Sequence, residues 1–339
     1  MRPSEAAEDA AAVIAADKTA VSRALNLVEN RRESSQAQVA SLLEALRPAP
    51  RAAAGHRVGL TGPPGVGKSS LAAALTREIR QRGRSVGVVA VDPSSIRSRG
   101  SLLGDRARMG FDPNDEGVFV RSLATGGEVG GLAYAANAAV RVLAAAYDVV
   151  IVETTGVGQS EVDVVHVVDT VVLVIQPGSG DVLQFLKAGI MEIPDILVVN
   201  KADQKELASR AVADLHGALR TAAAVGATAH SRPGWHTPII ATSAHDGTGI
   251  AELADALQDH RDHLKSTLNE RRREAEAQWA VQLFTRRHGE HGVKSLGGRA
   301  ELKRRVRESL SHEENPLSLS ERLSQEYLNG LGNTQRGQS

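Results

Sequence analysis

The chain has 339 residues, and its 40 lysine and arginine residues balance 40 aspartate and glutamate residues, so the formal net charge is zero. A neutral chain does not suit a protein whose main task is to grip nucleic acid or an anionic membrane. Only 3% of the residues are aromatic and none is cysteine, which argues against a base-stacking surface and excludes disulfides and thiolate catalysis. Acidic residues near the N-terminus leave no apolar signal segment, so we expect a soluble, cytoplasmic protein.

The first 50 residues are rich in alanine and leucine. Their apolar residues recur at helical spacing until Pro48 and Pro50. We therefore expect an N-terminal helical extension over residues 1–50.

Short apolar runs alternate with helical runs from residue 51 to residue 260, which we interpret as one domain. Six apolar runs predict strands, at 57–61, 86–92, 149–153, 171–176, 196–200 and 238–242. Helical runs at 71–80, 132–146 and 205–225 separate several of them. Uniformly apolar strands joined by helices are typical of an α/β fold whose doubly wound, mostly parallel sheet is covered on both faces. Such folds bind ligands at the carboxyl ends of the strands.

The region after Ile250 predicts one long helix that reaches Arg287 without a glycine or proline. At 1.5 Å per residue this helix would be more than about 50 Å long, too long to lie over one domain. We interpret residues 261–330 as a C-terminal helical arm that forms a homodimer. The alternative is a bent helix pair packed on the same subunit. Residues 331–339 are expected to be a disordered tail.

The strongest motif follows the first predicted strand. The residues Gly62-Pro63-Pro64-Gly65-Val66-Gly67-Lys68-Ser69 match G-x-x-x-x-G-K-[ST] and, with Ser70, open a predicted helix. Backbone N–H groups of such a loop surround phosphate oxygens, and the helix N-terminus adds positive potential. Lys68 is expected to neutralise the β- and γ-phosphates during catalysis, and the Ser69 hydroxyl to ligate Mg²⁺.

A second motif, Asn200-Lys201-Ala202-Asp203, ends the strand predicted at 196–200. The Asp203 carboxylate can accept hydrogen bonds from the ring N–H and the exocyclic amine of guanine, whereas adenine has no such pair of donors. Thr242-Ser243-Ala244 follow the next strand, where a G protein places backbone N–H groups on guanine O6. Together with the phosphate loop, these motifs predict a site for GTP and GDP.

A third group of residues concerns the metal ion and the attacking water. Glu153-Thr154-Thr155-Gly156 stand where a GTPase usually has Asp-x-x-Gly, which supplies an acid to the Mg²⁺ shell. Glu153 and Gln159 are both candidates to orient the water. Asp92 and Asp105 are further Mg²⁺ candidates, and for each the alternative is a helix cap or a turn.

With these motifs in place, the sequence resembles the MeaB/MMAA (ArgK-type) family over roughly residues 20–330. Further stretches at 91–95, 104–109, 153–161, 177–181 and 189–193 carry the resemblance. It implies a phosphate-loop GTPase, flanked by helical extensions, that docks on adenosylcobalamin-dependent methylmalonyl-CoA mutase and gates the loading or protection of the cofactor held by that partner. One departure is Ala107, where the family usually has threonine, so a hydroxyl is lost beside Asp105.

The resemblance also implies an extra switch after the strand predicted at 171–176, with Asp181 and Lys187 as its contacts with the mutase. The alternative is a loop and a capped helix with no coupling role. The alternative function is a kinase of an amino-acid transport binding protein, although the sequence shows no catalytic base for it. A metal-delivery GTPase is disfavoured, since cysteine is absent and the 11 histidines show no metal-ligand spacing.

Overall fold

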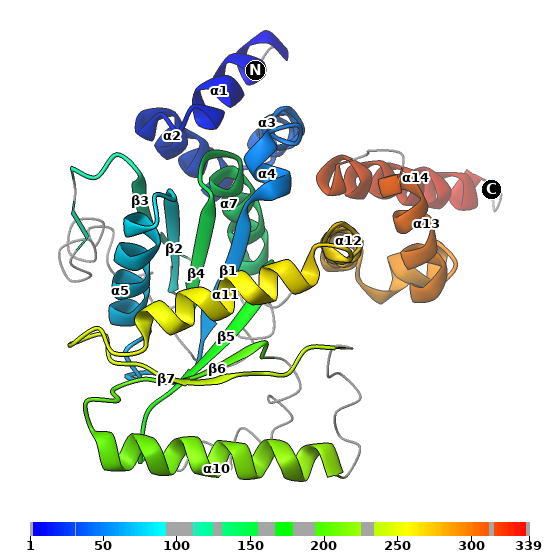
Figure 1. Cartoon of the computed structure of the whole chain (residues 1–339). Helices are drawn as coiled ribbons and strands as arrows, with labels where there is room; N and C mark the ends of the chain where they lie inside the picture. The colour runs from blue at the N-terminus through cyan, green and yellow to red at the C-terminus, as the bar shows by residue number, and fades with distance from the viewer. Residues whose placement is uncertain are drawn as a thin grey trace. The chain divides into compact units, whose positions relative to one another are not determined.

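The computed structural model describes residues 3–30, 32–92, 111–112, 114–124, 131–154, 167–178, 194–224, 234–311 and 315–336. The chain forms two compact units (Figure 1). One unit is Ala49–Ser266. The other combines Met1–Pro48 with Thr267–Ser339, so segments from both ends of the chain belong to the same unit. No helix among these residues is long and apolar enough to cross a membrane.

Seven strands form the sheet of the Ala49–Ser266 unit, in the order β3-β2-β4-β1-β5-β6-β7 (Figure 1). Each neighbouring pair is parallel. The strands are β1 His56–Thr61, β2 Val86–Asp92, β3 Val118–Ala124, β4 Val149–Thr154, β5 Thr170–Ile175, β6 Ile196–Val199 and β7 Ile239–Ala241. The predicted α/β fold with a parallel sheet is confirmed, and each of the six predicted strands lies within one residue of its expected ends. The prediction missed β3, because Arg121 and Ser122 interrupt its apolar run.

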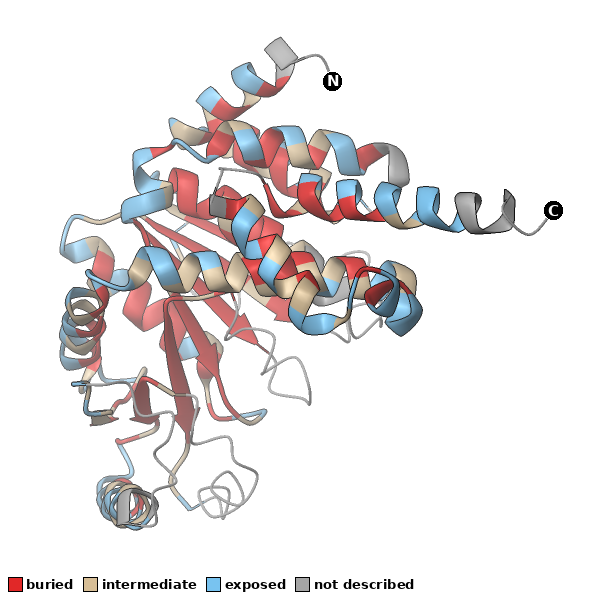
Figure 2. Ribbon diagram, turned by 90° about the vertical axis from the view of Figure 1, so that its right-hand side faces the viewer, coloured by how far each residue is buried: buried red, intermediate tan, exposed pale blue. Residues whose placement is uncertain are grey.

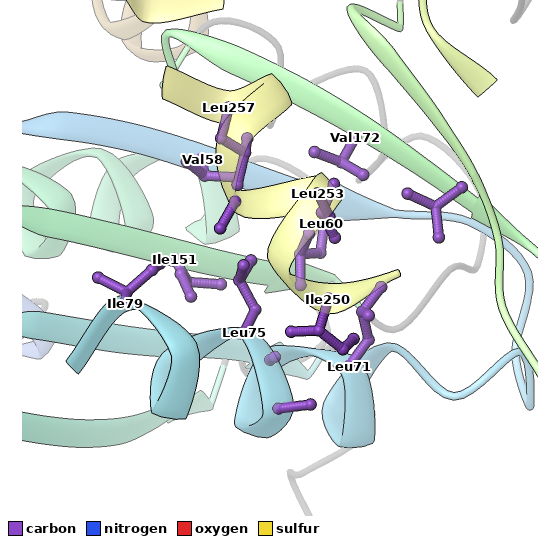
Figure 3. Close-up of a cluster of buried hydrophobic side chains, with 14 of the residues drawn as sticks. Val58, Leu60, Leu71, Leu75, Ile79, Ile151, Val172, Ile250, Leu253 and Leu257 are labelled. Carbon is purple, nitrogen blue, oxygen red and sulfur yellow. The ribbon is translucent and has the colours of Figure 1, made fainter. Parts of the chain in front are cut away.

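Helices cover both faces of this sheet, and the side-chain alternation along the strands divides the core between them. Helices α5 (Lys68–Gln81) and α11 (Ile250–Leu264) pack on one face, where Val58, Leu60 and Val172 are buried (Figure 3). Helix α10 (Lys205–Ala224) packs on the opposite face, against residues such as Leu173 and Ile175. Because alternate residues point to opposite faces, strands covered on both sides are apolar throughout, as the burial colours in Figure 2 show.

Two further helices complete this unit. Helix α7 (Gly131–Ala146) packs against β1, β2 and β4, and the short α4 (Pro50–Ala54) packs against α7. Gly87 of β2 permits a close approach, since an added Cβ would lie 3.0 Å from the Tyr147 ring.

The helical unit consists of α1 (Pro3–Ile14), α2 (Lys18–Glu29), α3 (Glu33–Leu46), α12 (Leu268–Ser295), α13 (Arg299–Ser311) and α14 (Pro316–Arg336). Phe284, Val306 and Leu323 are among the buried residues that join the last three helices. The Asn315 side chain donates a hydrogen bond to the Ala40 carbonyl (3.1 Å), which links α3 to the start of α14. The structure therefore groups the predicted N-terminal extension and C-terminal arm into one unit.

One expectation about the C-terminal region is wrong. The single helix predicted from Ile250 to Arg287 is broken between Leu264 and Leu268. There the Lys265 amide donates to the Asp262 carbonyl (3.3 Å), so α11 ends in a tighter i to i+3 turn; the Lys265 ammonium also pairs with the Asp262 carboxylate (2.8 Å). The disordered tail at residues 331–339 stays a prediction: α14 is assigned as far as Arg336, and residues 337–339 lie outside the described part of the chain.

Candidate nucleotide-binding site

The phosphate loop connects β1, the central strand, to α5. Gly62, Gly65 and Gly67 have φ values of 140°, 78° and 91°. A Cβ on Gly62 would lie 2.0 Å from the Val174 carbonyl oxygen, and one on Gly67 would lie 2.6 Å from Asn200 Nδ2. The strand, glycine-rich loop and helix that the motif requires are therefore present, and two of its glycines are needed for both space and backbone conformation.

Lys68 is the first residue of α5, and its side chain is 5% exposed. Its ammonium donates to the carbonyl oxygens of Gly62 (2.6 Å) and Pro63 (2.8 Å). A buried ammonium is stable only when it is hydrogen-bonded. These contacts hold a positive charge at the N-terminus of a helix, which is the electrostatic arrangement that binds phosphate.

The carbonyl groups of the loop are held on one side by the residues that follow β6. Asn200 Nδ2 donates to Val66 O (2.9 Å) and Gly67 O (3.4 Å), and Lys201 Nζ donates to Gly65 O (2.9 Å). In a trans peptide the next N–H points away from the carbonyl. The N–H groups of residues 66, 67 and 68 are thus turned away from Asn200 and Lys201, in the way a phosphate cradle requires.

Lys201 itself has an unusual backbone, with φ of 63° in a residue other than glycine. The neighbouring peptides are fixed, because the Asn200 amide donates to Ile175 O and the Ala202 amide donates to Thr242 O, each at 2.9 Å. The Lys201 ammonium also donates to Gln176 Oε1 (2.6 Å). Sequence analysis missed Gln176, and the only signal for it was its place directly after a strand, at the ligand-binding edge of the sheet.

The two predicted base-binding segments lie side by side, after β6 and β7. The Ser243 hydroxyl donates to Asp203 Oδ1 (3.1 Å), and the Thr242 hydroxyl donates to Asn200 Oδ1 (3.2 Å). Thr242 and Ser243 are fully buried, whereas Asp203 is exposed. Asp203 therefore has a fixed carboxylate with lone pairs accessible to a ligand, and Ala244 follows at the same edge.

Ser69 and Glu153 come together at the ends of α5 and β4. The Ser69 hydroxyl donates to Glu153 Oε1, and Glu153 is 7% exposed. Hydroxyl and carboxylate oxygens beside a phosphate loop are ligands that Mg²⁺ prefers, so this pair fits the ion. Among the described residues no three His, Asp or Glu side chains form a metal-binding group, and Mg²⁺ commonly completes its shell with water and phosphate oxygens.

The structure does not describe the side chains of the remaining predicted residues. Asp92 is the last residue of β2, which is separated from β1 by β4, and its side chain is outside the described part. Asp105, Gln159, Asp181 and Lys187 also lie outside the described residues.

A parallel sheet with a phosphate loop after its central strand and an Asn-Lys-x-Asp segment after β6 defines the class of phosphate-loop GTPases. Comparison with family models gives the particular family. The methylmalonyl Co-A mutase-associated GTPase MeaB family matches residues 21–294, and the chain belongs to it.

Individual relatives agree with this assignment. A Mycobacterium tuberculosis protein named as a probable GTPase is 41% identical over 309 residues, covering 88% of this chain and 89% of the relative. GTPase ArgK of Escherichia coli is 33% identical over 297 residues, covering 87% of each chain. A solved structure described as an LAO/AO transport system kinase is 28% identical, covers 86% of this chain and 87% of its own, and superposes with a TM-score of 0.66.

Proposed function

We propose that the protein is a GTP-hydrolysing chaperone that docks on adenosylcobalamin-dependent methylmalonyl-CoA mutase and gates the loading or protection of its cofactor. The observation that carries the proposal is the family match over residues 21–294, since the family is described by its association with this mutase. The cobalamin belongs to the partner in this proposal. This chain contributes binding to the mutase that depends on the bound nucleotide.

The nucleotide site gives each predicted residue a chemical task. Residues 62–70 surround the phosphates, and the Lys68 ammonium stabilises the negative charge that develops on them during hydrolysis. Asp203 pairs with the guanine N–H donors, and residues 242–244 offer backbone N–H groups to the guanine oxygen. Glu153 and Gln159 remain the two candidates to orient water.

Magnesium belongs to the same proposal. Ser69 and Glu153 would hold the ion, with Asp92 and Asp105 as further candidates. When bound, Mg²⁺ neutralises charge on the β- and γ-phosphate oxygens. The hydrogen bond from Ser69 to Glu153 brings the two oxygens together.

Guanine specificity is tested by calorimetry with GDP and ADP. The wild type should prefer GDP, and Asp203→Asn should relax that preference, because an amide can donate to the wrong ring pattern. Asp214→Asn, on the exposed face of α10, is the matched control and should bind as the wild type does. Equal affinities of the wild type for GDP and ADP would remove the guanine assignment.

The partner is tested by a pull-down from native lysate with a non-hydrolysable GTP analogue, followed by titration with purified mutase. We expect nucleotide-dependent capture of the mutase and faster GTP hydrolysis in its presence. Alanine at Asp181 and Lys187 should reduce that stimulation and leave intrinsic hydrolysis nearly intact. A purified mutase that neither binds nor stimulates the protein would refute the chaperone proposal.

Self-association through residues 261–330 also remains part of the proposal. Two leucines on α14 support it, since Leu328 and Leu331 are 53% and 38% exposed and lie three residues apart on one side of the helix. Light scattering should therefore give the mass of a homodimer. A monomeric mass would contradict the dimer.

The alternative function, a kinase of a transport binding protein, is favoured by one observation only, the description of the solved structure with a TM-score of 0.66. Radiolabelled GTP or ATP and candidate binding proteins would test it. Release of free phosphate without labelled protein would favour the GTPase, whereas stoichiometric labelling would favour the kinase.

A further inference from the structure

Among the described residues, Gln176 reaches the nucleotide site through the side chain of Lys201. It is the first residue after β5, and its Oε1 atom accepts a hydrogen bond from Lys201 Nζ at 2.6 Å. The same ammonium donates to Gly65 O of the phosphate loop at 2.9 Å. Gln176, Lys201 and Gly65 thus form a continuous chain of contacts from the end of one strand to the loop.

The backbone of Lys201 indicates that this row of contacts has a functional role. A left-handed backbone in a non-glycine residue costs free energy and persists where the surroundings over-determine it, often at ligand-binding sites. Holding a lysine side chain in one conformation is also costly in entropy, because the side chain has many rotamers. A second acceptor restricts the ammonium to one position, whereas Gly65 O alone would leave it free to swing.

The same contacts fix the orientation of the N–H groups proposed to bind phosphate. The contact from Lys201 fixes the peptide between residues 65 and 66, and the contacts from Asn200 fix the next two peptides. Asn200 has a partner of its own in the Thr242 hydroxyl at 3.2 Å. Gln176 holds the Lys201 side chain, and Thr242 holds the Asn200 side chain. Each side chain that binds the loop is therefore itself held by a second residue.

We propose that Gln176 is a positioning residue for the nucleotide site: it locks the Lys201 ammonium against Gly65 O and so keeps the phosphate loop in its binding conformation. The inference rests on the proposed nucleotide site and deepens it. It concerns nucleotide affinity rather than the chemical step, because Gln176 acts through the loop's shape and touches neither phosphate nor water in this scheme.

The test compares variants of the full-length protein by GDP and GTP binding and by steady-state GTP hydrolysis. Gln176→Leu removes the acceptor at nearly constant size, and we expect KM for GTP and Kd for GDP to rise by about tenfold, the effect of losing one hydrogen bond to a charged group. The value of kcat should stay within about twofold. Gln176→Glu keeps an oxygen at the same reach and should restore wild-type affinity.

A double-mutant cycle with Lys201→Met separates positioning from general structure. If Gln176 acts through Lys201, Gln176→Leu should weaken binding in the wild-type background and add nothing in the Lys201→Met background. Equal losses in both backgrounds would overturn the inference. So would wild-type affinity in Gln176→Leu, or a failure of Gln176→Glu to restore binding. Gln176→Ala, with a smaller side chain, repeats the comparison if the leucine variant does not fold.

Gln258→Leu is the matched control. Gln258 lies on α11, where it accepts from Arg84 (3.2 Å) and donates to Asp262 (3.0 Å), so the substitution breaks comparable contacts outside the phosphate loop and base segments. Its nucleotide affinity should equal that of the wild type. A wild type without guanine preference would refute the nucleotide site, whereas a guanine-binding wild type with an unaffected Gln176→Leu variant would refute only the positioning role.

Discussion

Asp148 shows how a single carboxylate joins elements at the edge of the sheet opposite the nucleotide site. It accepts hydrogen bonds from the Ser85 amide (2.9 Å), the Ser85 hydroxyl (2.7 Å) and Arg51 Nε (3.1 Å). Burial alone would raise the pKa of Asp148, but the Ser85 hydrogen bonds and the Arg51 contact outweigh it and hold the pKa below its ordinary value of 3.8. The native state therefore prefers this carboxylate ionised.

A lowered pKa in the folded state means that the contribution to stability is complete above the unfolded-state pKa and is lost as the pH falls through the folded-state pKa. Asp148→Asn should therefore destabilise the protein at pH 7, by about 1–2 kcal/mol. The difference from wild type should shrink as the pH falls below about 4. Urea unfolding over a pH series measures both effects, and a difference that stays constant with pH would contradict the explanation. Asp214→Asn, which is exposed, serves as the control.

Lys68 provides a second test at the residue scale. Lys68→Ala should reduce GTP hydrolysis by at least about 100-fold, because it removes a charge that stabilises the transition state. The protein should still fold, although the buried Gly62 carbonyl loses its donor, which costs about 1–3 kcal/mol; the Pro63 carbonyl is only partly buried. Lys205→Ala, at the exposed start of α10, is the control for a lost lysine. Turnover equal to that of the wild type would exclude the phosphate-loop interpretation.

Residue types and spacing sufficed to predict the motif residues. They did not predict the side chains that hold those residues in place. Lys68, Asn200 and Asp203 belong to short contiguous motifs with known chemistry. Gln176 lies 25 positions before Lys201 in the chain, and nothing in its local sequence distinguishes it from a surface glutamine. Contacts of this kind arise from the order of the strands in the sheet. The periodicity of a single sequence predicts strands but does not specify that order.

At the scale of elements, the packing of α11 on the sheet gives a direct test of the core. Leu253 is fully buried and lies in the same cluster as Leu60 and Leu75 (Figure 3). Leu253→Ala should lower the free energy of unfolding by about 2–5 kcal/mol, because it leaves a cavity between helix and sheet. Leu207→Ala, on α10 with 46% exposure, makes the same chemical change and should cost little. Equal urea midpoints for the two variants would refute this description of the core.

The apolar periodicity of the sequence predicted some helices and strands well and missed others. Strands buried on both faces are uniformly apolar and were predicted closely. The β3 strand was missed because Arg121 and Ser122 stand in its middle, and the break after Leu264 was missed because Lys265, Ser266 and Thr267 are all compatible with a helix. Helix α11 ends there in an i to i+3 backbone turn, a local competition that propensities do not resolve.

At the scale of the whole molecule, the division into two units predicts that residues 49–266 fold alone. The fragment should end at Ser266 rather than near residue 262, because α11 continues to Leu264, whose side chain is 2% exposed. It should bind GDP as the full chain does and should be monomeric, since it lacks the region proposed to self-associate. Calorimetry and light scattering measure the two properties. A fragment that still dimerises would place the dimer contact in the Ala49–Ser266 unit.

The grouping of both chain ends into one helical unit also sets an order of events during synthesis. The 218 residues from 49 to 266 must be translated between α3 and α12. At about 5–20 residues per second, this takes on the order of 10 to 40 seconds. Throughout that time the Ala40 carbonyl lacks Asn315 and α3 lacks its contact with α14, although α1–α3 have already left the ribosome. The Ala49–Ser266 unit, by contrast, has all its residues once Ser266 has emerged. The contact of α3 with α14 is therefore among the last to form, and for that interval the part of α3 that meets α14 is available to chaperones.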